Sequence, residues 1–211
     1  FLTAVTGNAE WVRPCQSFFP CGSQLESSNG APSASVDAAR RLLREGGYRG
    51  ERIVILQPAD FPALSALGHT AAETLRGIGM NVDLQVLDWA SVVSRRAKKD
   101  PPSPGGRHIF STYSHASDLL NPISHIGVNA GGDNAWFGWP KDDEIERLRA
   151  AFAREGDAAQ RKQIADALTR RAFEIGLYVP LGQFQWPSLH GSRISSMPDA
   201  PVTVFWGVQK R

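Results

Sequence analysis

The five histidines are the side chains best suited to catalysis or metal binding, and their spacing indicates neither. They are His69, His108, His115, His125 and His190. No two lie one helical turn apart, as they would in a zinc-binding helix. The chain also has no Gly-Lys-Ser/Thr phosphate loop and no serine in a nucleophile elbow. The sequence therefore predicts no enzyme, no metal site and no cofactor.

One enzymatic alternative stays open. His115 and His125 flank a loop that contains Asp118, so the three side chains are close in sequence. A hydrolase would use such a His–Asp pair if an imidazole faced a serine or a carboxylate in a closed pocket.

The aromatic residues form a more informative pattern. The stretch "DNAWFGWPKDD", residues 133–143, places Trp136, Phe137 and Trp139 in a loop. Tyr113 and Trp186 also fall outside any helical stripe. Aromatic rings on loops suit a ligand cleft or an interface between domains. A small core that anchors the loop to a sheet explains them equally well.

The two cysteines stand six residues apart in "CQSFFPCG". Pro20 and Gly22 allow a tight bend that lets Cys15 and Cys21 meet. We predict a disulfide, which requires an oxidising compartment such as a bacterial periplasm. The alternative is two buried thiols that are only neighbours.

Composition narrows the function classes. The chain has 211 residues, room for one large domain or two small ones. Its formal net charge of +2 arises from 23 basic and 21 acidic residues that alternate along predicted helices, so we expect no nucleic-acid surface. No apolar run reaches the ~18 residues of a membrane span. The chain begins at Phe1, which indicates a processed protein or a piece of a longer one.

The first half of the chain predicts an α/β fold. Residues 1–35 read as a loop-rich segment. A helix capped by Ser35 should follow to about Glu45, with Ala39, Leu42 and Leu43 facing inward. Residues 52–57 form an apolar run typical of a strand covered on both faces. A helical stripe begins at Pro62, and alternation over residues 81–89 indicates a second strand. Strand, helix and strand make a βαβ unit with parallel strands.

The second half continues this alternation. We expect a helix over residues 90–99, a strand over 108–113, a short helix over 118–125, and strands over 177–186 and 202–208. Two capping boxes predict helices that begin at Asp143 and Asp157. Asp142 and Asp143 then complement the dipole of the first of these helices and need no chemical role.

This order of elements resembles family 5 extracellular solute-binding proteins, the dipeptide, oligopeptide and nickel receptors of bacterial ABC importers. The resemblance rests on "DAARRLLREGGYRG", "LRGIGMNVDLQVLDW", "GWPKDDEIERLR" and "YVPLGQF". It covers about residue 36 to the end, with Gly46 where the family has alanine and Arg41 where it has lysine. A full-length member is about twice this long.

The resemblance implies that residues 36–211 are the C-terminal lobe of a type II periplasmic-binding-protein fold, with helices on both faces of a mixed sheet. The partners would be a small solute such as a peptide, the missing N-terminal lobe, and an ABC permease in the inner membrane, with the protein located in the periplasm. An inter-lobe module without ligand contact is the further alternative.

The resemblance also suggests where the ligand binds. Peptide-binding members hold the ligand's amino group with an acidic residue in the loop after the strand that matches "IFSTY", and Asp118 is the candidate here. The family's Asp-Pro pair is Asn121-Pro122 in this chain. Asp118 is alternatively the N-cap of a short helix. The predicted ligand-binding residues are Tyr113, Asp118, Asn121, Trp136, Phe137 and Trp139.

Overall fold

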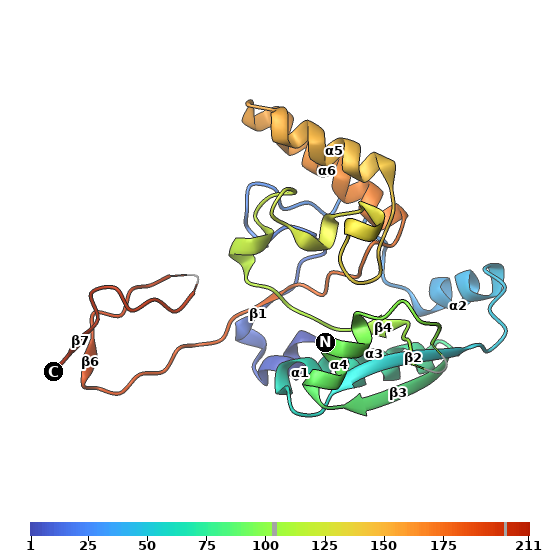
Figure 1. Cartoon of the computed structure of the whole chain (residues 1–211), viewed down its shortest axis with the longest axis horizontal. Helices are drawn as coiled ribbons and strands as arrows, with labels where there is room; N and C mark the ends of the chain where they lie inside the picture. The colour runs from blue at the N-terminus through green and yellow to red at the C-terminus, as the bar shows by residue number, and fades with distance from the viewer. Residues whose placement is uncertain (103–104, 201) are drawn as a thin grey trace.

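The chain forms a sheet layer, a helical layer and an extended C-terminal arm (Figure 1). A computed structural model describes residues 1–102, 105–200 and 202–211. The sheet layer contains a parallel sheet and the helices packed on it. The helical layer contains two long helices side by side and the loops next to them. The predicted break at residues 100–106 includes two residues outside the described part of the chain.

The sheet layer is built on the predicted βαβ unit. Strand β2 spans Arg52–Pro58, helix α3 spans Pro62–Gly77 and strand β3 spans Asn81–Leu87. Every residue of β2 pairs with a residue of β3 in parallel register. A third parallel strand, β4 (Ile109–Phe110), pairs with the other edge of β2, so β2 is the central strand.

Helices cover both faces of β2. Val54 and Leu56 point toward Val92 of helix α4 (Trp89–Arg96). Gln57, one step along the strand, lies on the opposite face against Gly68 of α3. Burial on both faces explains why the strand is an unbroken apolar run in the sequence. The α/β class is thereby confirmed.

The helical layer has a core of its own. Helices α5 (Asp143–Arg154) and α6 (Ala158–Glu174) pack together along their apolar faces. Phe18 and Phe19 from the N-terminal segment are both buried in this core. Their helical neighbours there are Ile145, Leu148, Phe152, Ala165, Leu168 and Ala172. A segment that reads as loop in the sequence thus supplies two of the largest core side chains.

The predicted start of α5 is wrong by one residue. Asp142, not Asp143, is the N-cap, and its carboxylate accepts a hydrogen bond from Ile145 N at 2.9 Å. The same carboxylate lies 2.7 Å from the Arg171 guanidinium of α6, and this interaction lowers the pKa of Asp142. The start of α6 is as predicted, because Asp157 accepts from Gln160 N at 2.9 Å.

The N-terminal segment connects the layers. It contains helix α1 (Leu2–Thr6), the 3₁₀ helix η1 (Ala9–Trp11) and strand β1 (Val12–Arg13). Leu2 packs against Leu64 and Leu67 of α3 in the sheet layer. β1 pairs antiparallel with β5 (Gln183–Phe184), a short piece of the strand predicted over residues 177–186.

The predicted disulfide is present, with Cys15 and Cys21 joined and their Cα atoms 6.1 Å apart. It closes a short loop, and loop-closure entropy predicts a stabilisation of about 2 kcal/mol. The double variant Cys15→Ala/Cys21→Ala should lose that amount in urea unfolding. Adding a reductant should destabilise the wild-type chain and leave the variant unchanged. An equal response of both to the reductant would contradict the prediction.

Helix α2 corrects one expectation about burial. It spans Val36–Glu45 and is capped by Ser35 as predicted, through Ala38 N at 3.2 Å. None of its residues is buried, however, and the side chain of Leu42 is largely exposed. The inward face that we assigned to this helix is therefore wrong for Leu42. The helix stands at the side of the sheet layer (Figure 1), attached by the Arg40 guanidinium, which donates to Gly77 O at 2.9 Å.

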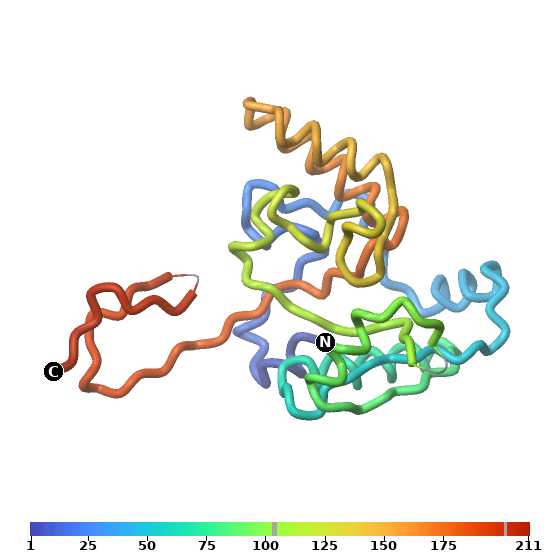
Figure 2. The backbone as a smooth tube through the Cα atoms, viewed as in Figure 1, coloured from blue at the N-terminus to red at the C-terminus, as the bar shows by residue number. Residues whose placement is uncertain are grey.

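The remaining elements are shorter than predicted. The segment after β4 holds η2 (Ala116–Leu119), η3 (Ile126–Val128) and η4 (Gly132–Asn134) in place of one helix over residues 118–125. The chain then leaves β5 as an extended arm (Figure 2). The arm ends in a hairpin of β6 (Ile194–Ser195) and β7 (Gln209–Lys210). No strand occupies the described residues 202–208, so that prediction is wrong.

Candidate functional site

The carboxyl edge of the parallel sheet gathers aromatic side chains. Phe61 follows β2, Trp89 follows β3 and Tyr113 follows β4, so parallel strands bring all three to one edge. Ligands of open α/β sheets bind outside this edge, because the loops there come from several strands. The strand order therefore predicts a binding surface at these three residues.

The rings at this edge contact one another. The centroids of Phe61 and Trp89 are 5.1 Å apart, and those of Phe61 and Tyr113 are 6.0 Å apart. Phe184 of β5 and Trp186 extend the group, at 5.8 Å and 6.4 Å from Tyr113. We call these five residues the edge cluster. Tyr113 is 39% exposed and Trp186 is 51% exposed, so the cluster offers ring faces to solvent.

The loop aromatics form a second group, the loop cluster of Trp136, Phe137 and Trp139. Trp136 meets Phe110 of β4 edge-on at 5.6 Å, and Phe137 lies between its two tryptophan neighbours. All three side chains are half-buried. Contact with β4 supports the interpretation that the loop is anchored on the sheet, while the remaining exposure leaves ring surface for a ligand.

Backbone geometry at Trp139 is unusual. Its φ is 48°, in the left-handed region that bulky residues rarely adopt. Trp139 N donates to Trp136 O at 2.8 Å, which closes a tight turn through Gly138. The Lys99 ammonium lies over the Trp139 ring at 4.9 Å. These contacts hold the strained turn, a feature often found at binding sites.

Asp118 and Asn121 differ in what their side chains do. Asp118 lies within η2, whose N-cap is His115, so the alternative that Asp118 caps a helix is wrong. Its carboxylate is exposed and accepts from Ser117 Oγ at 3.4 Å. Asn121 Oδ1 accepts from the backbone amides of Ile123 and Ser124, at 2.9 and 3.1 Å. Asn121 is thus used to form a turn, whereas Asp118 exposes its carboxylate to solvent.

His125 is buried and forms hydrogen bonds with the backbone of the loops around it. Its Nδ1 accepts from Gly127 N at 3.1 Å, so Nε2 carries the proton and donates to Phe18 O at 2.8 Å. Tyr178 Oη lies 3.1 Å from the same Nε2, and burial raises the pKa of Tyr178. Burial lowers the pKa of His125 to about 4. His115, by contrast, is exposed.

The part of the chain that the structure describes contains neither a metal-ligand cluster nor a membrane-spanning helix. Across residues 1–102, 105–200 and 202–211, no group of three or more His, Cys, Asp or Glu side chains could hold a metal ion. In the same ranges, no helix is both long enough and apolar enough to cross a membrane.

Comparison with known proteins gives a consistent result. No family model matches the chain. The chain is 33% identical over 213 residues to the "Probable peptide ABC transporter periplasmic-binding protein y4tO" of Sinorhizobium fredii, in an alignment that covers 99% of this chain and 40% of the relative. The chain is homologous to part of a solute-binding protein. The predicted resemblance is therefore confirmed, and the chain spans about two fifths of that relative's length.

Solved solute-binding proteins share the fold. A dipeptide-binding protein of Pseudoalteromonas sp. SM9913 in complex with Met-Leu matches 100% of this chain and 42% of its own, with a TM-score of 0.76 and 16% identity. The substrate-binding protein CtaP of Listeria monocytogenes matches 87% of this chain and 37% of its own, with a TM-score of 0.72 and 13% identity. The agropinic-acid protein AgaA of A. tumefaciens R10 has a TM-score of 0.67 at 21% identity, over 87% of this chain and 38% of its own.

Sequence reasoning missed three of the five residues of the edge cluster. Phe61, Trp89 and Phe184 belong to the edge cluster but were not predicted, because each also fits a helix start or a strand. The signal that was available is position: Phe61 and Trp89 both come directly after a predicted parallel strand. Phe184 had no such signal, since its place depends on pairing with β1.

Proposed function

We propose that this chain is the C-terminal lobe of a periplasmic solute-binding protein that captures a small peptide-like solute and delivers it to an ABC permease. The relatives are peptide-transporter binding proteins, and the chain has their fold. The lobe acts by binding alone, without catalysis or a cofactor. It forms one wall of a cleft, and a second lobe closes over the solute by a hinge motion.

The observation that carries this proposal is the edge cluster. Its rings lie where open parallel sheets bind ligands, and two of them are substantially exposed. Asp118 follows in the same segment as Tyr113, with its carboxylate open to solvent. Aromatic faces and an exposed carboxylate on one segment suit a peptide, which presents apolar side chains and an amino group.

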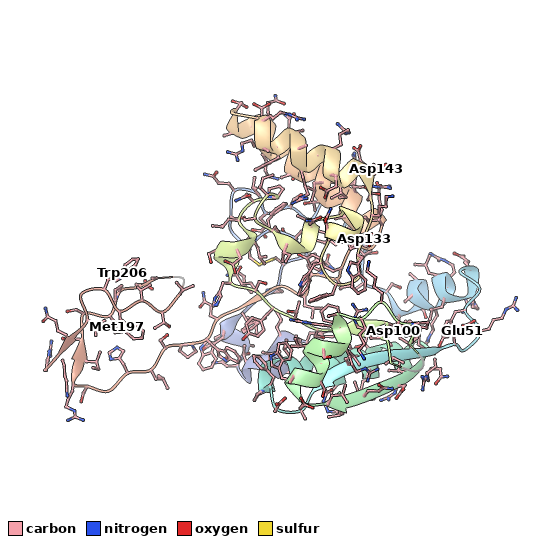
Figure 3. All side chains as sticks on the ribbon, viewed as in Figure 1. Glu51, Asp100, Asp133, Asp143, Met197 and Trp206 are labelled. Atoms are coloured by element: carbon pink, nitrogen blue, oxygen red, sulfur yellow. A yellow bond between two sulfur atoms is a disulfide. The ribbon has the colours of Figure 1, made fainter. Side chains whose placement is uncertain are left out.

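The C-terminal arm supports the presence of a second lobe. Leu189, Phe205 and Trp206 on the arm are 93%, 72% and 81% exposed. Figure 3 shows Met197 and Trp206 on the arm, away from both layers. Large apolar side chains so fully exposed mark an interaction surface. We assign that surface to the remaining lobe, which the arm would reach.

The environment of His125 favours binding over a hydrolase that would use this imidazole. A hydrolase needs an imidazole that faces a nucleophile or a reacting water. Both ring nitrogens of His125 are engaged with backbone groups of Gly127 and Phe18 instead. The buried imidazole therefore stabilises a loop.

Substitution of the edge cluster tests the proposal. In the full-length receptor, Tyr113→Ala and Trp186→Ala should each weaken binding of a dipeptide and tripeptide library about ten- to hundredfold. Loss of an aromatic contact of this area costs about 1.5–3 kcal/mol, and each 1.4 kcal/mol is tenfold in affinity. Isothermal titration calorimetry measures the dissociation constants.

Val86→Ala is the matched control, because Val86 is an exposed apolar residue on the outer strand β3, outside the edge cluster. It should leave peptide affinity unchanged. If the edge-cluster variants bind peptides normally but melt at a lower temperature, the cluster contacts the other lobe and the inter-lobe alternative is correct. If no peptide binds the wild-type receptor, the proposed solute class is wrong.

A further inference from the structure

Two arginines stack on the rings of the loop cluster. Arg96 ends α4 and Arg107 precedes β4, and the Arg107 Nη2 donates to Arg96 O at 2.6 Å. The Arg96 guanidinium carbon lies 5.5 Å from the Trp136 ring centroid and 5.0 Å from that of Phe137. The Arg107 guanidinium carbon lies 5.7 Å from the Trp139 ring. Trp89 for Arg96 and Phe110 for Arg107 are further rings at cation–π distance, so each charge is stacked on aromatic faces.

Within the described residues, no carboxylate oxygen comes within 4.0 Å of either guanidinium. The Nε atoms of Arg96 and Arg107 are buried and have no hydrogen-bond partner there. Asp133 of η4, on the side of the helical layer that faces the sheet (Figure 3), forms its ion pair with Lys99 instead. The neighbouring Arg95 differs, because its guanidinium donates to Gln85 and to the carbonyls of Gly105 and Gly106. Arg95 is structural, whereas Arg96 and Arg107 keep unused donors.

The local electrostatics leave positive charge uncompensated. Desolvation lowers the pKa of both arginines, and the charge of Arg96 lowers the pKa of Arg107 further. The C-terminal end of α4 offers at most about half a negative charge. The ring faces attract each cation but supply no full negative charge. The two guanidinium groups therefore carry positive charge that an anion would balance. A carboxylate suits this place, because its two oxygens match the planar fork of a guanidinium group.

We propose that Arg96 and Arg107, held by Trp136, Phe137 and Trp139, form a subsite for a carboxylate group of the bound solute. This inference rests on the proposed function, since a peptide supplies a carboxylate at its C-terminus. Trp89 connects the two surfaces: its ring contacts Phe61 of the edge cluster at 5.1 Å, and the Arg96 guanidinium carbon at 5.2 Å. A solute lying along the edge cluster would reach the subsite past Trp89.

Acetate tests the subsite independently of peptide binding. In full-length receptor labelled with ¹⁵N-arginine, acetate should shift the Nε–Hε resonances of Arg96 and Arg107 saturably, and chloride at equal ionic strength should not. Arg96→Lys and Arg107→Lys assign the two resonances and keep the charge. Resonances of both arginines that respond equally to acetate and chloride would overturn the subsite.

Matched peptide acids and amides test its role in binding. The wild-type receptor should bind peptide acids at least tenfold more tightly than the corresponding C-terminal amides, and Arg96→Gln should abolish this preference by weakening the acids alone. Arg96→Lys, which keeps the charge but not the fork, should fold normally and lose most of the preference. Arg154→Gln removes the same charge from an exposed position on α5 and should preserve it.

The outcomes separate the two proposals. Equal binding of acids and amides would overturn the subsite and leave the proposed function standing. An acetate response without any peptide binding would support the subsite and refute the peptide as the solute. If acetate does not shift the arginine resonances and no peptide binds, both proposals are overturned.

Discussion

Replacing Phe18 by alanine should destabilise the protein by about 3–5 kcal/mol, the usual cost of removing a fully buried phenylalanine. Phe18 is 1% exposed, and its ring meets those of Phe173 and Tyr178 edge-on at 4.8 and 4.7 Å. The side chain comes from the N-terminal segment and packs in the core of the helical layer against Phe173 of α6, so its removal leaves a cavity there. A loss of this size is a large part of the 5–15 kcal/mol that stabilises a typical domain. Urea unfolding followed by circular dichroism gives the difference.

Phe205→Ala is the matched control for this prediction. The same side chain is removed from the C-terminal arm, where Phe205 is 72% exposed. Its removal should change the stability of this chain by less than about 0.5 kcal/mol. Similar losses for the two variants would show that the N-terminal segment does not belong to the core of the helical layer.

The βαβ unit was predictable because local and global requirements agree there. Each local pattern fits a single type of secondary structure: the apolar run of β2 fits a buried strand, the stripe of α3 a helix, and the alternation of β3 a strand. The glycines at the end of α3 then allow the short turn into β3. Periodicity also located α5 and α6, because their inward faces are long. These elements contain most of the buried core.

Elements that depend on distant partners were not predictable to the same degree. The burial of Phe18 follows from contact with α6, about 150 residues later in the chain, and no local pattern marks it. β1 and β5 exist only because each pairs with the other. Conversely, α2 has a strong apolar face in the sequence but lies at the side of the sheet, so periodicity predicted a burial that does not occur.

In the candidate site, too, some residues were predictable from local sequence and others only from the fold. Trp136, Phe137 and Trp139 stood out because three aromatic residues share one short loop. Arg96 and Arg107 did not stand out, because arginines at a helix end normally serve the helix dipole. Only the fold shows that both lack a carboxylate partner among the described residues and share an aromatic wall.

Acidification should destabilise the protein through His125. The pKa of this imidazole is lowered to about 4 by burial, against about 6.5 in an unfolded chain. The folded state therefore prefers the neutral ring, and its stability contribution is complete above pH 6.5 and is lost as the pH falls toward 4. Protonation at Nδ1 would also place a donor against Gly127 N–H, which now donates to that atom. The loss between pH 7.5 and pH 4.5 should be about 2–3 kcal/mol.

Urea unfolding at the two pH values, for the wild type and for His125→Gln, isolates this contribution, because all other titrating groups are common to both proteins. The glutamine variant is less stable at pH 7.5, since the hydrogen bonds of His125 to Phe18 O and Gly127 N are lost or lengthened. Its further loss on acidification should be smaller than that of the wild type by about 2–3 kcal/mol. His190→Gln, at an exposed position on the C-terminal arm, should lose as much stability on acidification as the wild type. If His125→Gln and the wild type lose the same stability between pH 7.5 and pH 4.5, the buried imidazole is not the acid-sensitive group, and the loops around Phe18 do not depend on its neutral form.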